Sequence, residues 1–88
     1  MISEEVMLKN KLGIHVRPAS LIAKTASKYK SDFTIQKDDM VINGKSVMGI
    51  MMLAAGQGTK LKFIIDGVDE DELMREMVAI FENKFGEE

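Results

Sequence analysis

The chain of 88 residues contains no cysteine and only one histidine. The absence of cysteine excludes disulfides, thiolate metal sites and a cysteine nucleophile, and it fits the reducing cytoplasm. With one histidine and no cysteine, a stable zinc site is not expected. No apolar run approaches the roughly 18 residues that a membrane span needs, and the residues after Met1 do not form a secretory signal. We therefore expect a cytoplasmic protein with no membrane insertion, no metal and no cofactor.

Net charge, composition and length further restrict the kind of protein that this sequence can encode. The formal net charge is -2, so no strong field attracts nucleic acid. Apolar residues make up 45% and charged residues 30% of the chain, which is typical of a globular protein rather than a disordered one. The length fits a single domain over residues 1–88, because no repeat or linker interrupts it. A monomer is expected.

Hydrophobic periodicity predicts seven elements in the order β-α-β-β-α-β-α. Alternation, or short apolar runs between turn residues, predicts four strands over residues 2–8, 33–35, 40–42 and 60–65. Apolar positions at helical spacing predict three helices, over residues 16–29, 47–53 and about 15 residues from 69 onward. Helices packed on one face of the sheet would bury every apolar stripe. The expected fold class is therefore α+β, an open-faced sandwich.

Local signals mark the helix ends. Ser46 stands where an N-cap is expected, and Asp69 with Glu72 three residues later forms a candidate capping box. In the last helix the apolar stripe extends to Phe85, and Lys84 lies where the helix dipole favours a cation.

The single histidine, His15, lies between a glycine-containing loop and the start of the first helix, close to Arg17. Backbone N–H groups at a helix start lack intrahelical partners, and the dipole there favours anions. A helix start also disfavours imidazolium, so the ring is expected to stay neutral and nucleophilic. Arg17 could bind phosphoryl oxygens in a bidentate manner. The competing interpretation is a histidine with no function, because no general-base partner defines a catalytic site.

Two segments of the sequence favour a function for His15 over the competing interpretation. The string from Gly13 to Ser20 reads GIHVRPAS, and the string from Gly44 to Ile50 reads GKSVMGI. The first resembles the active-site segment, and the second the regulatory serine site, of HPr, the histidine-containing phosphocarrier family of the bacterial phosphoenolpyruvate:sugar phosphotransferase system. The resemblance spans essentially the whole chain and implies an antiparallel four-stranded sheet covered by three helices.

The resemblance implies a stoichiometric phosphoryl carrier rather than an enzyme. His15 would accept a phosphoryl group on Nδ1 from phospho-enzyme I and pass it to the A components of sugar-specific permeases. Arg17 and the backbone N–H groups of Val16 and Arg17 would bind the phosphoryl oxygens. Alanine or threonine is more usual in the family at position 16, so we expect the β-branched Val16 to affect docking or ring orientation without removing a chemical group.

Ser46 carries a second implied role. An HPr kinase/phosphorylase would phosphorylate it, which adds about -1.5 to -2 charge. We expect this modification to weaken transfer from enzyme I and to create a surface for a catabolite-control transcription regulator. A plain N-cap without regulation is the competing interpretation.

Exposed residues around both segments form the expected docking surface for partners. Flexible methionine side chains suit a carrier that binds several partners, although core packing is their commoner role. The expected docking residues are Val16, Arg17, Ser20, Lys24, Val47, Met48 and Met51.

Two alternative functions remain at this point. One is an HPr-like paralogue of a nitrogen-type or purely regulatory chain. The regulatory paralogue of this kind lacks the histidine, whereas His15 is present here. The other is an α+β binding module that is never phosphorylated.

Overall fold

A computed structural model describes residues 1–87 of the chain. The elements and their bounds are β1 (Ile2–Met7), α1 (Val16–Ala26), β2 (Asp32–Lys37), β3 (Met40–Asn43), α2 (Val47–Met52), β4 (Lys60–Asp66), α3 (Glu70–Glu82) and the short 3-10 helix η1 (Lys84–Gly86). The predicted order β-α-β-β-α-β-α is confirmed. Within residues 1–87, no helix is long and apolar enough to span a bilayer.

The four strands form one antiparallel sheet in the order β1-β4-β2-β3. The register places Phe63 of β4 opposite Ile35 of β2, and Val6 of β1 opposite Leu61 of β4. Because side chains alternate between the two faces of a strand, this register brings the apolar positions of all the long strands to one face. The other face carries polar residues such as Lys62.

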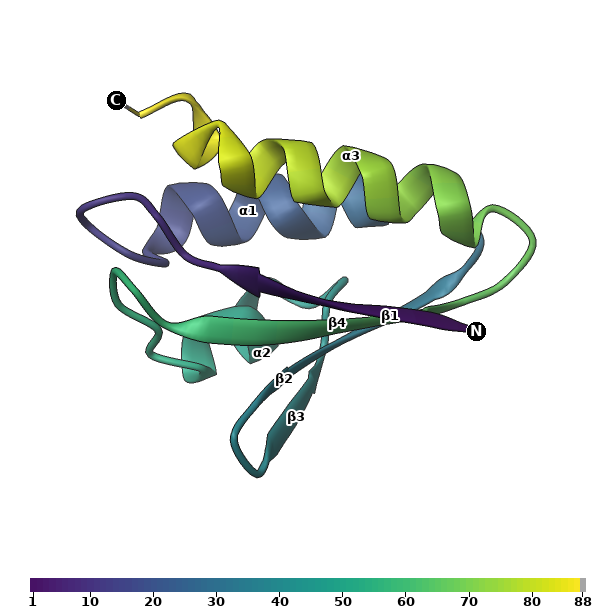
Figure 1. The fold of residues 1–88 in the computed structure, drawn as a ribbon, viewed down its shortest axis with the longest axis horizontal. Coiled ribbons are helices and arrows are strands. Elements are labelled where there is room, and N and C mark those ends of the chain that lie inside the picture. Colours follow the sequence, from purple (N-terminus) through teal and green to yellow (C-terminus); the bar gives the residue numbers. More distant parts are fainter. Residues whose placement is uncertain (88) are drawn as a thin grey trace.

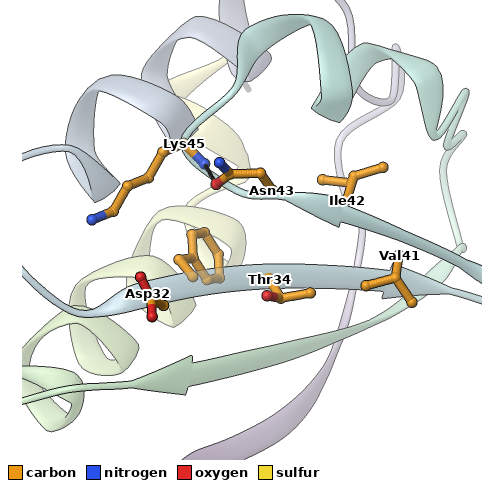
Figure 2. Close-up of a pocket in the computed structure, with 7 residues that line it drawn as sticks. Asp32, Thr34, Val41, Ile42, Asn43 and Lys45 are labelled. Atoms are coloured by element: carbon orange, nitrogen blue, oxygen red, sulfur yellow. Dashed lines mark hydrogen bonds between the residues drawn. The ribbon is translucent and has the colours of Figure 1, made fainter.

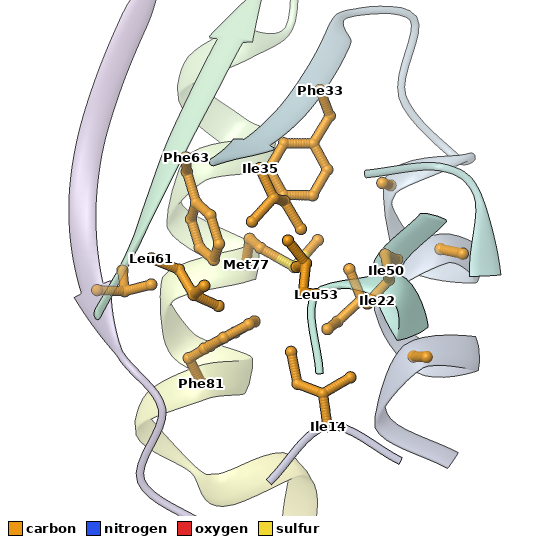
Figure 3. Packing of buried hydrophobic residues seen from close by; sticks show 14 of the residues in the cluster. Ile14, Ile22, Phe33, Ile35, Ile50, Leu53, Leu61, Phe63, Met77 and Phe81 are labelled. Atoms are coloured by element: carbon orange, nitrogen blue, oxygen red, sulfur yellow. The ribbon is translucent and has the colours of Figure 1, made fainter. Parts of the chain in front are cut away.

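The three helices cover the apolar face of the sheet, with α1 and α3 side by side (Figure 1). Ile22 of α1, Ile50 of α2 and Phe81 of α3 are each no more than 1% exposed. Their side chains meet Leu61 and Phe63 of the sheet in one core (Figure 3). The α+β open-faced sandwich predicted from the sequence is confirmed.

A junction between α1 and α3 lies at the end of α1 that is distant from His15. The helix ends at Ala26 rather than near residue 29, so Tyr29 follows it in a turn. The Tyr29 hydroxyl donates a hydrogen bond to the Glu76 carboxylate of α3. This bond raises the pKa of Tyr29 and lowers the pKa of Glu76. The contact therefore ties the end of α1 to the middle of α3.

The start of α3 differs from the prediction. Asp69 is the N-cap by position, but its side chain makes no capping hydrogen bond, so the predicted capping box with Glu72 is wrong. Its carboxylate instead accepts hydrogen bonds from the backbone N–H groups of Lys30 and Ser31 and from the Ser31 hydroxyl. These bonds, above all the one from the Ser31 hydroxyl, lower the pKa of Asp69 to about 2. Asp69 thus connects α3 to the turn before β2.

The end of α3 also differs. The helix ends at Glu82, so Lys84 lies beyond its last turn, in η1. Lys84 and Phe85 have φ values of 53° and 58°, and Gly86 has a φ of 74°. These three consecutive left-handed residues interrupt the helical backbone after α3. The segment that ends at Glu87 lies above the start of α1 (Figure 1).

Candidate functional site

The backbone around Gly13 determines where His15 lies. Gly13 has a φ of 68°, and a Cβ atom there would lie 2.5 Å from the carbonyl oxygen of Ala55. The same oxygen accepts a 3.0 Å hydrogen bond from the N–H of Ile14. The loop before α1 is thus held against the loop after α2 by backbone contact. His15 follows directly, as the N-cap residue of α1, with its side chain 33% exposed.

Two backbone donors lie beside the histidine. The N–H groups of Val16 and Arg17 are in the first turn of α1, and no carbonyl within residues 1–87 accepts a hydrogen bond from them. Pro18 comes next and has no N–H to satisfy. The Arg17 side chain is exposed and forms no ion pair with the described residues. An anion placed here would meet unpaired amides, a free guanidinium and the positive end of the helix dipole.

The His15 ring also has a partner that the sequence did not indicate. Its Nε2 atom lies 2.6 Å from Oε2 of Glu87, the residue that directly follows η1. The other carboxylate oxygen, Oε1, accepts a 2.8 Å hydrogen bond from Nδ2 of buried Asn10. Among residues 1–87 no hydrogen bond reaches Nδ1 of His15. The ring is therefore held at Nε2, and Nδ1 has no hydrogen-bond partner among residues 1–87.

The helix α2 contributes the second predicted segment. The Ser46 hydroxyl oxygen accepts a 3.0 Å hydrogen bond from the N–H of Gly49, so the predicted N-cap is confirmed. Met48 is 76% exposed and Met51 is 43% exposed, whereas Val47 is half-buried against the core. This helix packs against α1. Its exposed side chains thus extend the surface of the helix that begins at His15.

The α1 side of the expected docking surface is also accessible. Val16 is 55% exposed, and Ser20 and Lys24 are exposed at helical spacing from it. A shallow groove of about 300 Å³ lies beside them, lined by Val16, Arg17, Pro18, Ser20, Leu21, Phe85 and Glu87. Leu21 and Phe85 were not predicted to contribute to this surface. Phe85 was expected to continue the α3 stripe, and only the left-handed turn brings it here.

A larger hollow of about 450 Å³ lies elsewhere, along β2 and β3 (Figure 2). Thr34, Val41 and Asn43 line it, and the N–H of Lys45 donates a hydrogen bond to the Asn43 side chain. None of the predicted site residues lines this hollow. Within residues 1–87 no group of three or more histidine or acidic side chains is placed to hold a metal.

Sequence reasoning missed Asn10 and Glu87. Asn10 looks like an ordinary loop residue, and Glu87 is one acid in a charged chain end. Glu87 is 72 residues from His15 in the sequence, and no spacing rule connects the two. Asn10 is 0% exposed. Buried polar groups are normally hydrogen-bonded, so the burial of this amide indicates a structural role that the sequence does not reveal.

Comparisons with known proteins show what the whole chain is similar to. The family model described as "PTS HPr component phosphorylation site" matches residues 2–83. The phosphocarrier protein HPr of Neisseria meningitidis serogroup A is 42% identical over 87 residues, which cover 99% of this chain and 98% of the relative. The HPr-like protein Crh of Bacillus subtilis is 37% identical over 79 residues, 90% of this chain and 93% of the relative. A crystal structure of HPr-C-His from Thermoanaerobacter tengcongensis superposes with a TM-score of 0.96 and 44% identity, covering 100% of this chain and 99% of that one.

Proposed function

The chain belongs to the HPr family of phosphocarrier proteins of the phosphotransferase system, and on this basis we propose that His15 is its phosphoryl-carrying residue. The observation that supports this assignment is the arrangement at the start of α1. There the Nδ1 atom of His15 has no hydrogen-bond partner within residues 1–87, and the N–H groups of Val16 and Arg17 are unpaired next to it in the chain. We propose that residues 1–88 act as one domain in this role.

In the proposed loading step, the Nδ1 lone pair attacks phosphorus in phospho-enzyme I. The N–P bond forms while the bond from phosphorus to enzyme I breaks, and the electron pair of that bond stays with enzyme I. The N–H groups of Val16 and Arg17 and the Arg17 guanidinium bind the phosphoryl oxygens as the charge on them redistributes. No cofactor takes part.

In the proposed unloading step, a nucleophile of a permease A component attacks the same phosphorus, and the imidazole leaves. Both partners need access to His15, and the docking residues lie on α1, which begins there, and on α2, which packs against α1. Arg17, Lys24 and Met48 are exposed, so a partner can combine charge pairing with contact to flexible apolar side chains. Val16, Ser20, Val47 and Met51 complete the proposed docking surface. Its cations favour acidic partner faces.

We further propose that Ser46 is a regulatory phosphorylation site for an ATP-dependent HPr kinase/phosphorylase. The position of its oxygen as the α2 N-cap supports tolerance of a phosphate, because the helix start favours negative charge. The added charge would lie beside exposed Met48 and weaken transfer from enzyme I, while offering a surface to a catabolite-control transcription regulator. Incubation with a cognate kinase and ATP should add one phosphate that the Ser46→Ala variant does not take up. No modification of the native chain would contradict the proposal.

The regulatory paralogue remains the alternative, since Crh proteins are also among the similar proteins. The presence of His15 with a free Nδ1 supports the carrier role over it. Mass spectrometry under conditions that preserve acid-labile phosphohistidine separates the two. With enzyme I and phosphoenolpyruvate, the native protein should gain one phosphoryl group and His15→Ala none. Adding a permease A component should then discharge the native protein. Failure of the native chain to take up phosphate would overturn the carrier role.

A further inference from the structure

The contact between Glu87 and His15 determines which ring nitrogen can carry the proton. A neutral imidazole has one N–H donor and one acceptor nitrogen. A carboxylate oxygen lies 2.6 Å from Nε2, and an ionised carboxylate only accepts hydrogen bonds. The neutral ring must therefore place its proton on Nε2 to use this contact, and the Nδ1 atom then carries the lone pair.

The side chain of Asn10 orients the Glu87 carboxylate, because it can only donate hydrogen bonds to it. Its Nδ2 atom donates both to Oε1 of Glu87 and to the carbonyl oxygen of Gly13, each at 2.8 Å. Both partners are acceptors, so the amide can be oriented in only one way. Its Oδ1 atom is buried and has no hydrogen-bond partner among residues 1–87. Leaving this oxygen unpaired is unfavourable, and the orientation persists because turning the amide over would place oxygen against two oxygens.

The chain end holds Glu87 in this place by packing and by an unusual backbone. The Phe85 ring packs against Phe81 of α3 with 4.8 Å between ring centroids. Lys84 and Phe85 both adopt left-handed φ values, which are unfavourable for residues with a Cβ atom. Strain of this kind persists where the surrounding structure enforces it, and it often marks a functional site. Here the left-handed backbone at Lys84 and Phe85 directs the following residues so that Glu87 contacts the His15 ring.

We propose that Glu87 is a positioning residue, oriented by Asn10, that holds the proton of the neutral His15 ring on Nε2 and so keeps Nδ1 free for phosphoryl transfer. This proposal rests on the carrier function proposed above. When Nδ1 forms its bond to phosphorus, the donor's bond breaks and its electron pair leaves with the donor. The ring becomes cationic and keeps the Nε2 proton, which still faces the carboxylate. Discharge to an acceptor returns the pair to Nδ1 and restores the neutral ring.

The sharpest test is Glu87→Gln, which is nearly isosteric. Because Asn10 donates toward one side of the group at position 87, the glutamine must turn its oxygen to Asn10 and its NH₂ group to Nε2 of His15. That NH₂ donates to Nε2 and forces the ring proton onto Nδ1. In protease triads the corresponding carboxylate-to-amide change lowers turnover about 10⁴-fold through the wrong tautomer. The His15 ring is 33% exposed, so water competes, and we expect phosphoryl uptake to slow by ~10–100-fold.

Two further variants complete the design. Glu87→Ala removes the carboxylate without adding a donor, so both tautomers become populated and uptake slows less than in Glu87→Gln. Glu82→Gln is the matched control, because this exposed carboxylate at the end of α3 pairs with Lys9 rather than with His15. It should leave both the tautomer and the rate unchanged. The tautomer is read from the ¹⁵N chemical shifts of the two ring nitrogens at a pH where the ring is neutral, and uptake from single-turnover transfer by enzyme I.

The tautomer measurement uses unphosphorylated protein, so it is independent of the carrier function. The proposal expects Nε2–H in the native chain, Nδ1–H in Glu87→Gln, and slower uptake by Glu87→Gln than by Glu87→Ala. A native ring that is mainly Nδ1–H, or a Glu87→Gln protein that keeps Nε2–H and takes up phosphate as fast as Glu87→Ala, would overturn it. A native chain that takes up no phosphate would instead overturn the carrier function.

Discussion

Replacing Gly13 with alanine tests whether the loop that carries His15 depends on close backbone contact. The new Cβ atom would lie 2.5 Å from the carbonyl oxygen of Ala55 and 2.9 Å from Cα of Gly56. Both are backbone atoms, so no side chain can rotate to relieve the overlap. Gly13 also has a φ of 68°, a conformation that alanine adopts with difficulty. The loop before α1 and the loop after α2 must therefore separate.

The two effects add to a measurable loss of stability. The left-handed backbone destabilises alanine by about 1–2 kcal/mol, and relief of overpacking adds about 1–3 kcal/mol. Alanine also reduces the conformational entropy of the unfolded chain, which stabilises the fold by about 0.4–1 kcal/mol. We expect the free energy of unfolding to fall by about 1–5 kcal/mol, out of the ~4–13 kcal/mol usual for a chain of this length.

Two other glycines provide matched controls. At Gly58 the φ is +88° and nothing lies within 4 Å of the added Cβ, so Gly58→Ala measures the backbone effect alone. At Gly56 the space is open and φ is not positive, so Gly56→Ala should be neutral or slightly stabilising. Urea unfolding of the three variants should give Gly13→Ala the largest loss, Gly58→Ala about 0.5–1 kcal/mol and Gly56→Ala none. If Gly13→Ala loses no more than Gly58→Ala, the argument from backbone contact is wrong.

Three other predictions concern the cap of α2, its exposed face and the start of α3. Ser46→Ala removes the hydrogen bond to the Gly49 N–H and should lower the free energy of unfolding by about 1 kcal/mol, whereas an unchanged urea midpoint would contradict the capping role. Met48→Ala should leave stability unchanged, since the side chain is 76% exposed, while raising the Michaelis constant for this chain in an enzyme I assay; an unchanged constant would argue against docking there. The pKa of Asp69 falls from 3.8 to about 2 on folding, so its ionised form stabilises the fold fully above pH 3.8 and loses this effect as the pH falls toward 2. The difference in urea midpoint between native protein and Asp69→Asn should shrink over that range, and a constant difference would refute the assignment.

Helices and strands were predictable from the sequence where the residues that determine them lie close together in the chain. Leu61, Phe63 and Ile65 alternate along β4, and all three are buried as the alternation requires. Ser46 caps α2 because its partner is three residues away. The placement of His15 at the start of α1 likewise follows from the adjacent residues.

Contacts between distant segments were not predictable in this way. Asp69 looks like the start of a capping box, yet its carboxylate accepts hydrogen bonds from Ser31, 38 residues earlier. A local capping bond and a tertiary bond compete for the same oxygens, and only the packed structure decides between them. Glu87 reaches His15 because Lys84 and Phe85 adopt left-handed backbone. Propensities favour the right-handed form for such residues, so sequence reasoning extends the helix past Glu82, where it ends.

The Tyr29–Glu76 contact has a consequence for spectroscopy. The chain has no tryptophan and a single tyrosine, so its near-ultraviolet fluorescence originates from one phenol that is hydrogen-bonded to a carboxylate. Emission should change when the α1–α3 junction opens. Tyr29 follows the end of α1 that is distant from His15, and the 11 residues of this helix span about 16 Å, too far for direct contact with a group on that ring. Tyrosine emission can therefore follow unfolding of this protein while remaining insensitive to phosphate on the imidazole.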